Sequence, residues 1–144
     1  TKPTSVILLQ AAFSHNGFAK AFKPGQDGFF RSVMSSEKVH GPILVTHTNN
    51  DKANAVAYPI ASRIAGQNAA ALGGPDDDYG AIGANGAQHT PEAIDGTLLD
   101  PGAAGYDFSH GRIYNLRSDN YIADHGDVHG EAVAYAILSA VAAC

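Results

Sequence analysis

The chain has 144 residues, a length that fits one compact domain with a modest hydrophobic core. Hydrophobic residues make up 44% of it and charged residues only 16%, so we expect it to bury apolar surface rather than to be disordered. The formal net charge is -5 and no cluster of Lys or Arg is present, which argues against nucleic-acid binding. No apolar stretch approaches the roughly 20 residues that span a bilayer, so we expect no membrane partner either.

The only cysteine is the last residue, Cys144, so no internal disulfide can form. This cysteine usage favours a soluble protein of the cytoplasm. The chain opens at Thr1 without a signal-peptide pattern and enters a strand pattern at Ser5. This abrupt start predicts a processed or excised segment.

The first expected element is a strand at residues 5–13, a continuous apolar run (SVILLQAAF) that is typical of a strand buried on both faces. Residues 14–40 mix aromatic residues with Gly and Lys and show no clean period, apart from a short helical turn near residues 29–34. A second buried strand is predicted at residues 43–48, and it ends in a polar turn of two Asn and one Asp.

A helix is predicted next, at residues 53–66, from apolar residues at helical spacing, with Pro59 as its start or a kink. Residues 67–110 are rich in Gly, Ala, Asp and Pro and show no sustained period, so we interpret them as a long excursion without regular structure. Their Gly spacing resembles a phosphate-binding loop only superficially, because no strand pattern precedes it and no helix pattern follows.

The last two elements are a strand at residues 112–116 and a helix that places four apolar residues on one face, namely Ala134, Ile137, Leu138 and Val141. Strands therefore alternate with helices along the chain. This alternation predicts an α/β fold with a mainly parallel sheet.

Two polar residues follow the second and third predicted strands, at the strand ends where open parallel sheets place their chemistry. Asp51 comes directly after the second strand, and His125 lies in the loop after the third. An imidazole can move a proton, and a carboxylate can fix its tautomer and stabilise the imidazolium. The chain order of acid before histidine is also the order found in α/β-hydrolases.

The residues around this pair are similar to the last two strand-loop-helix units of the α/β-hydrolase superfamily. The similar segments are PILVTHTNND (42–51), AVAYPIASRIAG (55–66) and NYIADHGDVHGEAVAYAIL (120–138), with SVILLQAAFS (5–14) as the strand before them. The resemblance implies one segment, residues 1–144, from the C-terminal half of a three-layer α/β-hydrolase domain. It implies Asp51 as triad acid and His125 as triad base for acyl transfer or ester hydrolysis, with no cofactor and no metal.

The family's Gly-x-Ser-x-Gly nucleophile motif is absent from the 144 residues. Ser14 follows a strand, but its neighbours Phe13 and His15 are too bulky for the sharp turn that the motif requires. We therefore expect the chain alone to be inactive and unlabelled by serine-directed fluorophosphonates. We expect it to need another protein chain, either an N-terminal half or a second copy, against the otherwise unpaired edge of its first strand.

Other interpretations remain open at this point. Asp51 can cap the helix that follows it. His125 can be an ordinary surface residue beside a helix-capping Asp127, or it can bind a metal ion in a His125-x-Asp127-x-His129 cluster of a metal-dependent hydrolase. An N-terminal Thr1 nucleophile would require a β-rich fold, which the alternation contradicts. Finally, the chain can be a non-catalytic binding or structural module.

Overall fold

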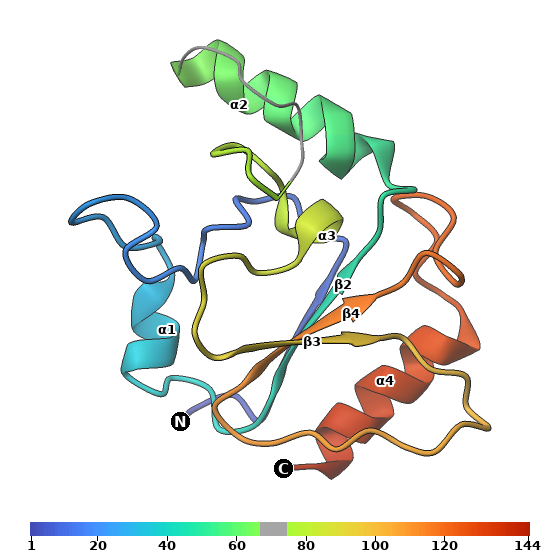
Figure 1. Cartoon of the computed structure of the whole chain (residues 1–144). Helices are drawn as coiled ribbons and strands as arrows, with labels where there is room; N and C mark the ends of the chain where they lie inside the picture. The colour runs from blue at the N-terminus through green and yellow to red at the C-terminus, as the bar shows by residue number, and fades with distance from the viewer. Residues whose placement is uncertain (67–74) are drawn as a thin grey trace.

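The computed structural model describes residues 1–66 and 75–144, with the side chains of residues 63–66 outside the description. Its elements in chain order are β1 (Val6–Leu9), α1 (Arg31–Ser35), β2 (Ile43–His47), the π-helix η1 (Ala53–Ala57), α2 (Tyr58–Gly66), α3 (Ile82–Asn85), β3 (Ala93–Thr97), β4 (Ile113–Arg117) and α4 (Glu131–Ala142). The strands form one sheet in the order β1-β2-β4-β3, and every pair is parallel (Figure 1). The predicted α/β class with a parallel sheet is confirmed.

The second and third predicted strands correspond closely to β2 and β4, whereas the first is much shorter than predicted. It ends at Leu9 because Gln10 adopts a left-handed backbone conformation with φ of 45°, which turns the chain out of the sheet. The carbonyls of Ala11 and Phe13 then accept hydrogen bonds from Gly83 and Ile82 of α3. The apolar run therefore covers a strand followed by a segment that holds α3 in place.

The prediction that the first strand is buried on both faces is wrong. Within the described ranges, β1 forms an edge of the sheet with β2 as its one strand neighbour, and all four of its residues are half-buried. The central strands β2 and β4 are nearly fully buried. An apolar, half-buried strand at a sheet edge is an unusual feature, since edges of parallel sheets are normally covered or charged.

The predicted excursion at residues 67–110 contains two regular elements that the sequence analysis missed, α3 and β3. Residues 67–74 of that stretch lie outside the described residues. β3 has the sequence AIDGT, whose Asp and Gly are disfavoured in strands, and it is short and mostly exposed. It forms because β4 offers a parallel partner along its whole length, which no local pattern reveals.

Apolar side chains lie on both faces of the sheet. On one face Leu44, Tyr114 and Leu116 pack against α4, and on the other Ile43, Val45 and Ile113 pack with Met34 of α1 and Ile82 of α3. Helices therefore cover both faces of the sheet, and α2 lies beyond its carboxyl edge (Figure 1). No helix in the two described ranges is long and apolar enough to cross a membrane.

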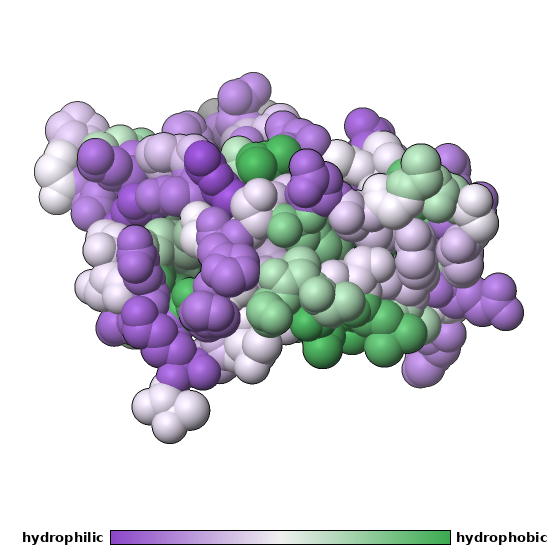
Figure 2. All heavy atoms as spheres, turned by 90° about the horizontal axis from the view of Figure 1, so that it is seen from below, coloured by the Kyte–Doolittle hydropathy of each residue, from purple (hydrophilic) through white to green (hydrophobic). Residues whose placement is uncertain are grey.

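The face of α4 that packs on the sheet differs from the predicted one. The buried residues are Ala132, Val133, Ala136 and Ala140, whereas Leu138 is 68% exposed and Val141 is 53% exposed. Small side chains let the helix approach the sheet closely, so the larger apolar residues remain outside. Figure 2 shows the molecule from below, and hydrophobic side chains gather along one side of that face.

Candidate functional site

Asp51 and His125 meet at the carboxyl edge of the sheet. β2 and β4 are parallel neighbours, so the loops that follow them leave the sheet side by side. His125 Nδ1 lies 2.7 Å from Asp51 Oδ2. The predicted approach of these two side chains to hydrogen-bonding distance is confirmed, while their catalytic roles remain predictions.

The two partners differ sharply in exposure. The Asp51 side chain is fully buried, and the His125 side chain is 51% exposed. A hydrogen bond from Nδ1–H to the carboxylate leaves Nε2 of the ring with a free lone pair, which is the nitrogen that serves as the base in a hydrolase triad. This pair therefore has a carboxylate held inside the protein and an imidazole open to solvent.

The buried carboxylate of Asp51 is also hydrogen-bonded to the start of η1. Its Oδ1 accepts from the backbone N–H of Asn54 (3.0 Å), and its Oδ2 accepts from Asn54 Nδ2 (2.7 Å). The backbone contact is the capping interaction that the sequence allowed for Asp51. The cap and the contact with His125 are thus made by the same carboxylate at once.

Gln10 lies on the other side of Asp51 and is almost completely buried. In the orientation of its side-chain amide that gives both polar atoms suitable partners, the nitrogen donates to Gly83 O (2.9 Å) and to Asp51 Oδ2 (3.1 Å). The amide oxygen then accepts from Thr46 Oγ1 (3.3 Å). The Gln10 backbone carbonyl accepts from Asn54 Nδ2 at 2.8 Å. Two amide side chains therefore enclose the carboxylate within the protein.

The two loops that contain the pair are tied to each other. Asn50 Nδ2 donates to the carbonyls of Asp119 (2.9 Å) and Ile122 (3.0 Å), and Thr48 Oγ1 donates to Asp119 Oδ1 (2.7 Å). Burial raises the pKa of Asp119, but the hydrogen bonds from Thr48 and Arg117 outweigh it and lower that pKa below its usual value. An ionised Asp119 therefore fixes the His125 loop against the end of β2.

The metal interpretation finds no geometric support. In the described residues no group of three or more His, Cys, Asp or Glu side chains could hold a metal ion, so His125, Asp127 and His129 do not form a cluster. Asp127 instead accepts a hydrogen bond from the backbone of Ala123 within its own loop (2.9 Å). The helix-cap interpretation of Asp127 is also wrong, because α4 begins after Gly130 without a side-chain cap.

The described contacts of Ser14 are with its own loop and with Ala81, and not with His125. Its hydroxyl accepts a hydrogen bond from the backbone N–H of Asn16 (3.2 Å), and its backbone forms an isolated bridge with Ala81. These contacts belong to the loop that covers α3.

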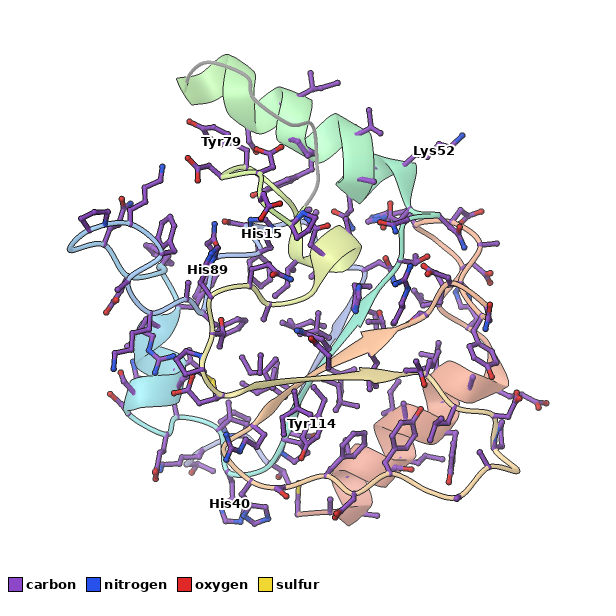
Figure 3. The ribbon with its side chains drawn as sticks, viewed as in Figure 1. His15, His40, Lys52, Tyr79, His89 and Tyr114 are labelled. Carbon is purple, nitrogen blue, oxygen red and sulfur yellow. The ribbon has the colours of Figure 1, made fainter. Side chains whose placement is uncertain are left out.

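A second histidine site was missed by the sequence analysis, which assigned no role to His15. The His15 ring is fully buried, and its Nδ1 lies 3.1 Å from Asn85 Nδ2. Burial, and after it the proximity of His89, lower the pKa of His15 to about 4. Figure 3 shows His15 and His89 on neighbouring loops. Only tertiary contacts distinguish His15, since its sequence neighbours carry no motif.

A cavity of about 350 Å³ opens at the carboxyl ends of β2, β4 and β3. Its lining is mainly polar and includes His47, Asn49, Gln88, Asp95, Arg117 and Asp119. Burial lowers the pKa of His47, so this imidazole is neutral at physiological pH. The cavity shares Asp119 with the network that fixes the His125 loop.

Comparison of the chain with protein-family models, with curated proteins and with solved structures returns no match. The α/β-hydrolase resemblance therefore rests on the quoted segments and on the geometry of the Asp51–His125 pair alone.

Proposed function

We propose that this chain supplies the acid and the base of a serine-hydrolase-type site, with Asp51 as acid and His125 as base, for acyl transfer or ester hydrolysis. The main support is the 2.7 Å contact between a fully buried carboxylate and a half-exposed imidazole at adjacent strand ends. In the reaction His125 Nε2 accepts the proton of the nucleophilic serine and later donates it to the leaving group. Asp51 stabilises the imidazolium formed between these steps.

The nucleophile is proposed to reside on another polypeptide segment whose strand pairs with β1. β1 has an unpaired side and half-buried apolar residues, and Ile7 and Leu9 pack toward the same cluster as α4. The exposed Leu138 and Val141 of α4 add apolar surface that a covering element would bury, at about 1.5–3 kcal/mol for each fully buried side chain. A strand parallel to β1 would end at the carboxyl edge, beside the Asp51–His125 pair.

A second copy of this chain is a less suitable partner for β1 than a separate segment. Two β1 edges related by a two-fold axis perpendicular to the sheet would pair antiparallel, so the carboxyl edges would lie at opposite ends. The chain also contains no Gly-x-Ser-x-Gly motif to contribute. Sedimentation of the purified chain tests the need for a partner: a stable, cooperatively melting monomer at micromolar concentration would contradict it.

The function is tested with a fluorophosphonate, which modifies only an activated serine. Native material that contains the chain is labelled, isolated with an antibody against residues 1–144, and digested to locate the labelled serine. We expect no label within residues 1–144 and a labelled serine on the segment that accompanies them. A labelled serine within the chain, or an accompanying segment that reacts equally after His125→Ala, would contradict the proposal.

The matched control is His129→Ala. His129 is exposed and lies in the same loop as His125, but it makes no contact with Asp51 in the described hydrogen bonds. Labelling should be lost with His125→Ala and retained with His129→Ala. Equal loss in both variants would indicate damage to the loop rather than removal of the base.

A further inference from the structure

Asn54 is the residue most closely engaged with the Asp51–His125 pair, and the sequence analysis gave it no role. It is fully buried in η1. Its amide nitrogen donates to Asp51 Oδ2 at 2.7 Å and to the carbonyl of Gln10 at 2.8 Å. A primary amide has two N–H donors, so both are used by these two acceptors.

The same amide nitrogen lies 3.5 Å from His125 Nδ1. Since its two hydrogens are already engaged, it has none left to donate to the ring. The two nitrogens instead converge as donors on one oxygen, Asp51 Oδ2, which also accepts from the Gln10 amide nitrogen. With Asp51 as a carboxylate acceptor, this arrangement places a proton on His125 Nδ1, and in the neutral ring Nε2 is then the acceptor nitrogen.

Three unusual backbone features surround this oxygen. η1 is a π-helix, Gln10 has a positive φ without being glycine, and Gly83 approaches so closely that a Cβ there would lie 2.4 Å from Asn54 Nδ2. π-helical turns and strained residues are frequent at functional sites. Here all three features serve to bring amide groups up to the Asp51 carboxylate.

The Asn54 amide also has a stability cost. Its carbonyl oxygen Oδ1 is buried without a hydrogen-bond partner in the described structure. A buried acceptor without a partner is destabilising, and an apolar side chain of the same shape would avoid it. The favourable contribution of the Asn54 side chain therefore comes from its amide nitrogen, which donates to Asp51 and to Gln10.

We propose that Asn54 is a positioning residue that keeps the Asp51 carboxylate turned toward His125, and thereby holds His125 in the tautomer with its proton on Nδ1. This inference rests on the proposed function, because that tautomer matters only if Nε2 acts as a base. Without the Asn54 donor, the carboxylate would lose one of its fixed contacts and could rotate. His125 would then populate the other tautomer, in which Nε2 is protonated and cannot accept the serine proton.

The test uses the chain together with the segment that accompanies it, with ¹⁵N only in the chain, because the chain is proposed to need that partner. The ¹⁵N resonances of the His125 ring are recorded at neutral pH in the wild type, in Asn54→Leu and in the control Asn49→Leu. Asn49 belongs to the loop between β2 and η1, and its described hydrogen bond is made by its backbone N–H to Asp119. We expect one Nδ1-protonated tautomer in the wild type and in Asn49→Leu, and a mixture in Asn54→Leu.

A second variant, Asn54→Ala, covers the case in which Asn54→Leu fails to fold. It removes the same donor nitrogen without placing a larger side chain in the buried site, so the single-tautomer pattern should again be lost. A wild-type tautomer pattern in a folded Asn54 variant would overturn the inference. Fluorophosphonate labelling reports separately on the proposed function, because it can fail while the tautomer still depends on Asn54. In the assembled hydrolase, Asn54→Leu should lower kcat with little change in KM.

Discussion

Two polar clusters in the described part of the chain, around His125 and around His15, use histidine in opposite ways. At the carboxyl edge the acid Asp51 is buried and the ring of His125 is half exposed, whereas at the loops over α3 the ring of His15 is itself fully buried. His125 faces a buried carboxylate, while His15 faces the amide of Asn85 and has a pKa lowered to about 4. The ring of His125 is open to a second molecule, whereas burial favours the neutral form of the His15 ring.

The comparison shows that the presence of a histidine in a polar cluster says little about its chemistry. The chemistry of the histidine depends on whether its carboxylate partner or its own ring is buried away from water. A buried carboxylate stabilises a positive charge on an exposed ring, whereas burial of the ring itself excludes that charge. The predictions below test this difference, beginning with the largest expected effect.

Removal of the Asp51 charge should have the largest effect. Asp51→Asn replaces the carboxylate by an amide that cannot stabilise an imidazolium and that favours the wrong tautomer of His125. In the proposed hydrolase, with the nucleophile segment present, we expect kcat to fall by a factor on the order of 10⁴. Asp107→Asn, which alters an exposed carboxylate elsewhere in the chain, should leave kcat unchanged. Activity of Asp51→Asn within tenfold of the wild type would remove Asp51 from the mechanism.

Acid should destabilise the fold through His15. Its folded pKa of about 4 lies below the usual histidine value of 6.5, so the unfolded chain binds the proton more tightly. This contribution to stability is present above pH 6.5, declines as the pH falls, and is lost below pH 4, in total about 3 kcal/mol. Urea denaturation between pH 7 and pH 4 measures it.

The matched variants for this prediction are His15→Gln and His129→Gln. His15→Gln should be less stable than the wild type at pH 7 but should lose less stability toward pH 4. His129→Gln, at an exposed position, should follow the wild-type curve. Identical pH dependence in all three proteins would show that His15 does not titrate as a buried neutral group.

A pair of glycine substitutions compares the packing around the two histidines. A Cβ at Gly80 would lie 2.5 Å from two atoms of the His15 ring, whereas a Cβ at Gly126 would have its nearest neighbour, Asp124 Oδ1, at 3.6 Å. Gly80→Ala should therefore cost about 1–3 kcal/mol of unfolding free energy. Gly126→Ala, next to His125, should change it by less than about 0.5 kcal/mol. Equal losses in thermal or urea denaturation would contradict the contrast.

The smallest effect is expected for the exposed ion pair near His15. Lys23 Nζ lies 2.9 Å from Asp78 Oδ2, and both side chains are substantially exposed. Solvent screens such pairs, so Lys23→Ala should leave the thermal midpoint of unfolding nearly unchanged. A large decrease in the thermal midpoint would contradict this expectation and would show that the surface ion pair near His15 contributes substantially to stability.

Local patterns in the sequence predicted the central part of the fold. β2 and β4 are rich in large apolar residues because both of their faces are buried, and the polar residues after them mark the carboxyl edge. The contact between Asp51 and His125 followed from this parallel arrangement together with the hydrolase resemblance. These features could be predicted because each depends on a short stretch of chain and on one general rule of sheet geometry.

Other features depend on contacts between residues far apart in the chain, and only the tertiary structure decided them. β3 forms because β4 pairs with it, β1 ends early because Gln10 turns toward α3, and α4 presents its alanine face because small side chains fit the sheet. Asn54 and His15 acquire their roles in the same way, from neighbours that burial brings to them. The sequence by itself determined which segments are apolar and where the polar turns fall. The tertiary structure decided which polar groups lose their water, because desolvation is a property of the packed molecule and not of any local pattern.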